Sequence, residues 1–388
     1  MIPFGCSGAI ALTPQQRQRA LYWMPALAAG LIAWIAFLVI GHTPIIRASG
    51  MALTVVGMAL ALRPMSAALS VIGGLALAFS PSFWLQAGGA EILNPLHVLI
   101  ALIAAAVVAG AILLLSKRPI IGIAVGFILF AALFFSTVGT PRSLRLTTVL
   151  TAWTLYLMVD GLLVSNPRAD EPSNGALGGH HTLGLLLLLA VGVANDPLFV
   201  LLVPAGGLGL FLSRKRLSLG YWVALLAIFA YGLYGISQTY YSEFWWNFPV
   251  DQAMSLSYRI PYLIGGVWRE PERWIQLMGL IVGQFTAFGL VLGVLGLARL
   301  SRWHPPVGVV TMIAFGTYAA FGLIYFGADS PILLLPLLMI QLLWMTYAMY
   351  TFGQWLQKSR NSVRLRWFAT ALFTLLPFFM LLRIVGIA

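Results

Sequence analysis

The chain alternates between long apolar runs and short breaks that contain glycine, proline, arginine or asparagine. The runs are about 15–22 residues long, the length with which an α-helix crosses a bilayer, whereas barrel strands are shorter and alternate in polarity. The pattern therefore predicts an all-α polytopic membrane protein with about 13 transmembrane helices. The predicted segments are 21–40, 48–62, 67–80, 95–116, 120–138, 146–164, 183–194, 198–212, 219–236, 275–300, 307–326, 332–355 and 368–387.

Three stretches depart from this pattern. Residues 1–20 end in a polar run and are predicted to be a cytoplasmic N-terminal segment. Residues 165–181 have the composition of a flexible linker and are expected to form a cytoplasmic loop. Residues 237–274 are rich in aromatic and charged side chains, which suits an outer aromatic loop in the headgroup layer. Residues 21–388 are then a single transmembrane domain.

The composition supports this membrane assignment. Of the residues, 61% are hydrophobic and 8% are charged, whereas a soluble domain has about a quarter of its residues charged. The single cysteine, Cys6, excludes a disulfide framework within the chain and a cysteine-based metal site.

The net charge of +12 does not indicate nucleic acid as a partner, because the basic residues lie in short loops between apolar runs. With the N-terminus in the cytoplasm, the alternating segments place 15 of the 22 Lys and Arg residues inside and seven of the ten acidic residues outside. This is the distribution that the positive-inside rule describes. It favours a multi-pass protein with a cytoplasmic N-terminus, surrounded by membrane lipids.

One polar stretch, residues 78–97, interrupts the apolar pattern most clearly. An apolar run ends at Ser80-Pro81, and Phe83 and Trp84 follow. Glu91 and Asn94-Pro95 then precede the next run. A charge between two membrane segments is costly if it faces lipid, so it usually faces water or a cavity.

Four features of this kind recur at the predicted outer face: Glu91 with Asn94, Asn195-Asp196, the aromatic loop with Arg259, and Asp329. Such carboxylates can act as a general base or hold a divalent metal ion, and an arginine can hold a phosphate. The alternative for each is a helix cap or an interfacial anchor. The candidate catalytic residues are Glu91, Asp196 and Asp329, and the candidate substrate-binding residues are Arg47, Asn94, Asn195, Trp246, Arg259 and Tyr262.

Other polar or glycine-rich positions have simpler interpretations. His180-His181 are expected in the solvated loop, without a carboxylate at ligand spacing, and Asp160 is expected to be paired or to reach the interface. The glycines of residues 204–209 suit close helix packing. Nucleotide-binding and metalloprotease motifs are absent from the sequence.

Several ordered pieces carry a family resemblance. LAFSPSFWLQA at residues 77–87 leads into Ala90-Glu91, and VAND at 193–196 precedes an apolar run with Pro204. Three further pieces are WNFP at 246–249 with Tyr258-Arg259 and Tyr262, Gln284-Phe285 to Gly296-Leu297, and YFGAD at 325–329 before Leu334-Leu335-Pro336. Over residues 20–355 the chain resembles bacterial membrane glycosyltransferases of the GT-C superfold, in the group related to protein O-mannosyltransferases.

The resemblance implies a protein of the bacterial plasma (inner) membrane that performs an inverting sugar transfer on the outer face, from a polyprenyl-phosphate donor and with an acidic residue as base. One departure concerns that base. The family begins with a span and a large outer loop that carries the expected catalytic aspartate, and residues 21–49 resemble the part of the family sequence after that loop. The sequence has no Asp or Glu before Glu91.

Three functions remain open at this stage. The first is an active glycosyltransferase in which Glu91, Asp196 or Asp329 acts as base. The second is a non-catalytic GT-C-like subunit of a larger complex of membrane proteins. The third function is a transporter or lipid flippase, for which inverted repeats are expected.

Overall fold

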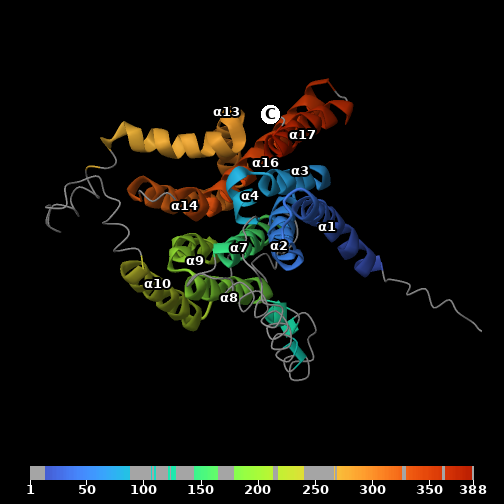
Figure 1. Ribbon diagram of the computed structural model, residues 1–388. Coiled ribbons are helices and arrows are strands. Elements are labelled where there is room, and N and C mark those ends of the chain that lie inside the picture. Colours follow the sequence, from blue (N-terminus) through green and yellow to red (C-terminus); the bar gives the residue numbers. More distant parts are fainter. Residues whose placement is uncertain are drawn as a thin grey trace, which may run out of the picture.

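The computed structural model describes residues 14–87, 144–164, 179–212, 217–239, 269–325, 329–360 and 363–386, with a few residues between 106 and 127 and residue 266. Within these residues the chain is helical and contains no strand, as the apolar runs predict (Figure 1). The helices are α1 (Pro14–Val39), α2 (Ile45–Leu62), α3 (Ala67–Ala78), α4 (Pro81–Ala87), α7 (Leu144–Val164), α8 (Gly179–Asn195), the 3-10 helix η1 (Pro197–Leu202), α9 (Val203–Leu212), α10 (Leu219–Thr239), α13 (Pro271–Trp303), α14 (Pro305–Ile324), α15 (Ser330–Leu333), α16 (Leu335–Arg360) and α17 (Val363–Val385).

Eleven of the 13 predicted segments coincide with these helices, while segments 95–116 and 120–138 lie largely outside the described residues. Among the described helices, α1, α10, α13, α14, α16 and α17 are long and apolar enough to cross a membrane. By length and composition, the chain is a multi-pass membrane protein. The full count of 13 crossings stays a prediction.

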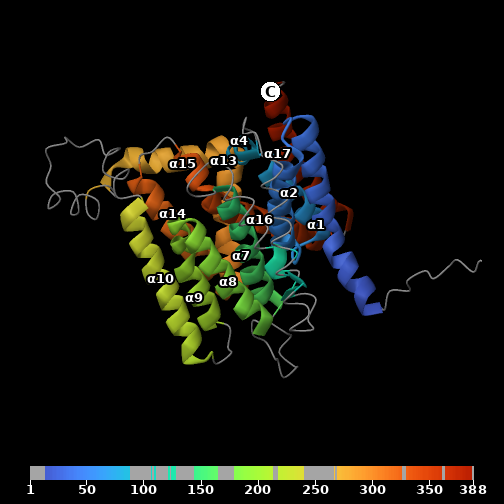
Figure 2. The same ribbon diagram turned by 60° about the horizontal axis from the view of Figure 1, so that its bottom comes forward.

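The bundle is organised around α16, which is buried along most of its length and contacts α3, α13, α14 and α17. By contrast, α10 lies at the edge and is exposed along most of its length (Figures 1 and 2). Large apolar side chains such as Leu31, Leu226 and Phe378 are exposed on α1, α10 and α17. Such apolar outer faces suit helices that border lipid.

Glycines allow the central helices to touch. A Cβ on Gly296 of α13 would overlap the backbone carbonyl oxygen of Trp344 on α16, and one on Gly293 would overlap the side-chain amide of Gln341. That amide donates from Nε2 to the carbonyl oxygen of Gly289 at 3.0 Å. Helices in membranes associate closely at small residues because lipid supplies little hydrophobic drive for their contact.

A helical hairpin forms where α8 meets η1 and α9, with its turn at Asn195-Asp196-Pro197. The chain is extended at Asp196, with φ −144° and ψ 113°, and Pro197 begins η1. The two arms pack closely, since a Cβ on Gly192 would overlap the ring of Phe199. The turn of this hairpin therefore holds Asp196 at one end of the bundle.

Helix α13 is bent. Thr286 has φ 63° and ψ 172°, which is not helical, so the element consists of two arms. In Figures 1 and 2 the first arm runs across the end of the bundle, and the second turns down beside α16. The first arm buries Arg273, Leu277 and Ile281 at a spacing of four residues, while Trp274 is partly exposed. One face of this arm therefore covers the bundle.

Candidate functional site

The short helix α4 lies at the meeting point of several elements, at what is termed the α4 end of the bundle. Trp84 contacts Phe37 of α1 at a ring-centroid distance of 5.3 Å and Phe79 at 6.1 Å. The helix also contacts α2, α3, α13 and α15. Ser80 precedes Pro81 and accepts from Trp84 N at 2.9 Å through its backbone carbonyl oxygen, which fixes the first turn of α4. The stretch that interrupts the apolar pattern is thus a junction of the fold.

Helix α4 is tied to the bend of α13 by a buried hydrogen bond. The backbone N–H of Ser82 donates to Gln284 Oε1 at 2.9 Å. One residue earlier, the carbonyl oxygen of Gly283 accepts from Arg383 Nη1 at 3.2 Å. These contacts hold the end of the first arm against α4 and α17, immediately before the bend at Thr286.

The other end of α4 is tied to α7 through Gln86. Its Oε1 accepts from Thr148 Oγ1 at 3.0 Å, and its backbone carbonyl accepts from Arg145 Nε at 2.9 Å. The Gln86 Nε2 is buried and donates to no atom of the described residues. An unsatisfied buried amide costs about 1–3 kcal/mol, so such a group calls for an explanation.

Asp196 is fully buried at the same end and serves as a helix cap. Its Oδ1 accepts from the backbone N–H of Leu198 at 3.1 Å, and its Oδ2 accepts from Thr147 Oγ1 at 3.2 Å. Asn195 Nδ2 donates to the same threonine hydroxyl at 3.0 Å. Because Thr147 and Thr148 are consecutive, α7 links Asn195 and Asp196 to Gln86. The cap interpretation of Asp196 is therefore confirmed.

Arg47 lies in the first turn of α2 and is 1% exposed. Helix α2 begins just after the end of α1, which contacts α4 through Phe37 and Trp84. Arg47 therefore lies at the α4 end, within a helix and with its guanidinium buried. It does not reach into solvent from a loop.

A cleft of about 230 Å³ is lined by Tyr325 and Ser330, and Asp329, which does not itself line the cleft, contacts the first of these residues. Asp329 Oδ1 accepts from the Tyr325 hydroxyl at 2.6 Å. Across the cleft, Arg273 is 7% exposed and donates from Nη1 to Gln276 Oε1 at 2.9 Å. The lining residues are Arg273, Gln276, Leu277, Leu280, Gly322, Tyr325, Ser330, Pro331 and Leu334. The first arm of α13 thus forms one wall, and the segment between α14 and α16 forms the other.

The described residues include four of the nine candidates from the sequence: Arg47, Asn195, Asp196 and Asp329. Glu91, Asn94, Trp246, Arg259 and Tyr262 lie outside them, as do most of the loops 165–181 and 237–274. The sequence candidates omitted the groups that join the site together, namely Gln86, Thr147, Thr148, Arg273 and Gln284. An isolated glutamine inside an apolar run was the available signal for Gln86 and Gln284.

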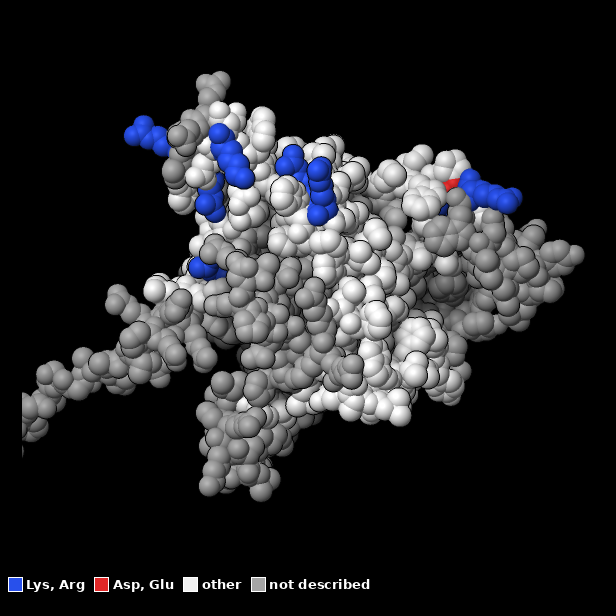
Figure 3. All heavy atoms as spheres, turned by 180° about the vertical axis from the view of Figure 1, so that it is seen from behind, with Lys and Arg blue, Asp and Glu red and all other residues white. Residues whose placement is uncertain are grey.

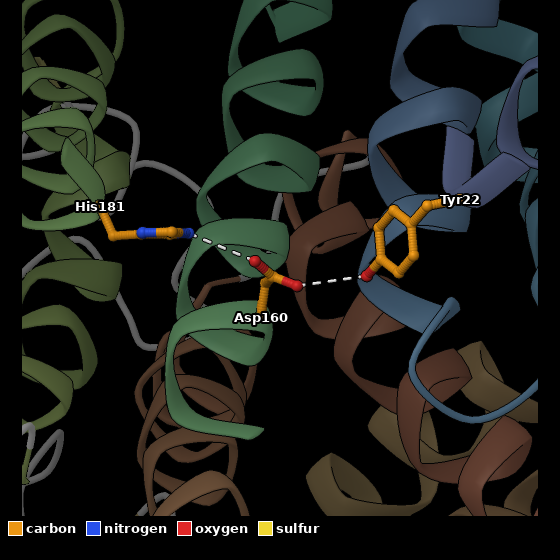
Figure 4. Close-up of polar contacts among 3 residues, drawn as sticks. All are labelled: Tyr22, Asp160 and His181. Atoms are coloured by element: carbon orange, nitrogen blue, oxygen red, sulfur yellow. Dashed lines mark hydrogen bonds and ion pairs between the residues drawn. The ribbon is translucent and has the colours of Figure 1, made fainter. Parts of the chain in front are cut away.

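A second polar cluster lies at the opposite end of α1, α7 and α8 (Figure 4). Asp160 Oδ1 accepts from the Tyr22 hydroxyl at 3.2 Å, and its Oδ2 lies 3.2 Å from His181 Nε2. The pairing expected for Asp160 is confirmed. The expectation that His181 lies in a solvated loop without a carboxylate is wrong, because α8 begins at Gly179 and carries His181 to Asp160. Antiparallel neighbours bring the end of α7 to the start of α8.

Replacing Asp160 by Ala is expected to destabilise the packing of α1, α7 and α8. The change removes the acceptor of both Tyr22 and His181, and hydrogen bonds to a charged group contribute about 1.5–3 kcal/mol. The thermal unfolding midpoint of the purified chain in mild detergent should fall clearly. Asp160→Asn keeps one carbonyl oxygen and should fall less. An unchanged midpoint for Asp160→Ala would show that the cluster does not hold these helices together.

Among the described residues, no group of three or more His, Cys, Asp or Glu side chains lies close enough together to hold a metal ion. In comparisons with known proteins, the chain matches no family model, no curated protein and no solved structure.

Proposed function

We propose that the protein is a GT-C-like membrane glycosyltransferase, which transfers a sugar from a polyprenyl-phosphate donor at the α4 end of the bundle. This end faces outward from the bacterial plasma membrane, and the N-terminus is cytoplasmic. The observation that carries the proposal is the cleft under the first arm of α13, where Arg273 lines one wall and Asp329 adjoins the other. An inverting transfer requires these two charges, a cation for the phosphate and a carboxylate base.

The chemistry assigns a role to each charge. The acceptor oxygen attacks the anomeric carbon while the bond from that carbon to the phosphate oxygen breaks. Asp329 takes the proton of the acceptor, and the Tyr325 hydroxyl orients its carboxylate. The departing polyprenyl phosphate keeps the bonding electrons, and the guanidinium of Arg273 stabilises its charge through charge-assisted hydrogen bonds. The carboxylate of Asp196 caps η1, so we assign the role of base to Asp329 rather than to Asp196.

Arg273→Gln is expected to weaken the binding of a photoactivatable polyprenyl phosphate roughly 10- to 100-fold, the range of one charge-assisted hydrogen bond. Crosslinking of the purified full chain in mild detergent measures this change. Arg273→Lys keeps the charge but loses the planar fork, so it should be intermediate. Arg269→Gln is the matched control, because Arg269 is exposed and does not line the cleft. Equal crosslinking by Arg273→Gln and the control would exclude the cleft as the phosphate site.

The base is tested separately from the binding site. Asp329→Asn should keep the crosslink to polyprenyl phosphate while sugar transfer from a polyprenyl-phosphate sugar in membranes falls about 10²- to 10⁴-fold. Transfer at the wild-type rate would exclude Asp329 and leave Glu91 as the carboxylate to test.

A second candidate function is that of a non-catalytic GT-C-like subunit in a larger membrane complex. The cap role of Asp196 favours it, because one of the three candidate bases is committed to the fold. This function predicts that polyprenyl phosphate still binds, that no sugar is transferred, and that mild solubilisation recovers a stoichiometric membrane partner. A monomer that transfers sugar would exclude it.

A further inference from the structure

Exposed basic side chains gather where α13, α16 and α17 have neighbouring ends. Arg299 and Arg302 lie near the end of α13, Lys358 near the end of α16, and Arg364 and Arg366 at the start of α17. All five are exposed. Together these five residues are termed the basic end. Figure 3 shows basic side chains gathered over this part of the molecule, with no acidic side chain visible among them.

Ring contacts bring these helix ends to one level. His304, between α13 and α14, lies 6.1 Å from the ring of Tyr347 on α16, and Tyr347 lies 6.1 Å from Tyr350. Arg366 of α17 places its Cζ 6.0 Å from the centroid of the Tyr350 ring. Gln354 Nε2 donates to the Tyr350 hydroxyl at 2.7 Å. Residues far apart in the sequence therefore form one continuous surface.

The positive charge of the basic end has no compensation from its own helices. The sequence contains no Asp or Glu between Glu272 and Asp329, and none after Asp329. The second arm of α13 and helices α14, α16 and α17 therefore carry no carboxylate. An isolated cluster of this kind attracts anions from a distance of about one Debye length, roughly 8–10 Å.

Three exposed tryptophans give the depth of this surface in a bilayer. Trp303, Trp355 and Trp367 are 66%, 56% and 61% exposed, and each lies within three residues of a basic side chain. Tryptophan concentrates at the level of the lipid headgroups, where its ring lies in an apolar layer and its N–H in a wet one. The basic end is therefore at the same depth as lipid phosphates.

We infer that the basic end is a binding surface for anionic phospholipid headgroups, such as phosphatidylglycerol. The arginines hold the lipid phosphate, and the tryptophans contact the upper part of the acyl chains. The orientation rule accounts for basic residues anywhere in the loops at this end. The same rule does not explain why the pairs α13–α14 and α16–α17 bring their basic side chains together on one surface with aromatic rings. The inference stands apart from the sugar transfer proposed above, because it concerns the other end of α13.

Two matched single variants test the inference with the full chain in mild detergent. R302Q removes one charge from the basic end, while R269Q removes one exposed arginine from the opposite side. Titration with short-chain phosphatidylglycerol, read by native mass spectrometry, should give an affinity roughly fivefold lower for R302Q. R269Q should match the wild type, and phosphatidylcholine should bind weakly to all three proteins.

Several outcomes would overturn the inference. The first is an equal loss of affinity in R302Q and R269Q, and the second is equal binding of the two lipids. The third is that the wild type is recovered with an acidic protein in place of lipid and that R302Q no longer retains this protein. If R302Q fails to fold, the salt dependence of the wild type decides the question. Raising the ionic strength should weaken phosphatidylglycerol binding and leave phosphatidylcholine binding unchanged. A salt-independent affinity for phosphatidylglycerol would contradict a charged headgroup site.

Discussion

Asp196→Ala is expected to destabilise the protein by about 2–4 kcal/mol, since it removes a helix cap and leaves buried donors without an acceptor. The backbone N–H of Leu198 and the hydroxyl of Thr147 both donate to this carboxylate, and Asp196 is fully buried. Water cannot replace the lost acceptor in such a place. Thermal unfolding in mild detergent measures the loss. Thr151→Ala serves for comparison, because the Thr151 hydroxyl donates within α7, to the carbonyl oxygen of Thr147 at 2.8 Å.

Asp196→Asn separates the cap from a catalytic role. The amide keeps a carbonyl oxygen for the N–H of Leu198, and the Thr147 hydroxyl can accept from its Nδ2. Stability should therefore stay within about 1 kcal/mol of the wild type. If the carboxylate were the base, this variant would be folded and inactive, so sugar transfer by Asp196→Asn at the wild-type rate is the expected result. A folded and inactive Asp196→Asn would contradict the assignment of the base to Asp329.

Gly296→Ala is expected to have the other large effect on stability. The new Cβ would overlap the backbone carbonyl oxygen of Trp344, and a backbone atom in the central helix α16 cannot turn aside as a side chain can. Helices α13 and α16 must separate, and overpacking of this kind costs about 1–3 kcal/mol or more. The unfolding midpoint in detergent should fall, or the variant should not accumulate in the membrane.

Gly316→Ala is the matched control for this substitution. Gly316 lies within α14, and a Cβ there meets no atom within 4 Å. Alanine favours helix over glycine by about 0.5–1 kcal/mol, so the control should be as stable as the wild type or slightly more. Equal destabilisation by both substitutions would mean that the contact between α13 and α16 is not the cause.

Periodic apolar runs determined most of the helical architecture, and polar breaks such as Ser80-Pro81 and Asn195-Asp196-Pro197 marked the positions where helices end. The bend of α13 could not be predicted in the same way. The residues on both sides of Thr286 are apolar, so hydropathy gives one run from 275 to 300. Thr286 has a positive φ, and the residues just before it contact Ser82 and Arg383, which lie outside this run.

The candidate site shows the same limit. Acidic residues stand out in an apolar sequence, which is why Asp196 and Asp329 were recognised. Their surroundings differ because of groups that local sequence does not reveal. Thr147, 49 positions away, binds Asp196, while Arg273 reaches the cleft beside Asp329 only because the first arm of α13 crosses the bundle. The contact between Asp160 and His181 could not be predicted in the same way. The two residues are separated by a loop in the sequence, but their side chains lie 3.2 Å apart in the structure.

The bend at Thr286 also has a consequence for the thickness of the surrounding bilayer. A straight helix of 33 residues would be about 50 Å long. The arm that follows the bend has about 17 residues and is only about 26 Å long, less than the roughly 30 Å of a typical hydrocarbon core. Hydrophobic matching favours a thinner bilayer beside this arm, which draws the lipid headgroups inward. For the proposed polyprenyl-phosphate donor, this thinning would bring the phosphate closer to the cleft while the chain stays within the hydrocarbon layer.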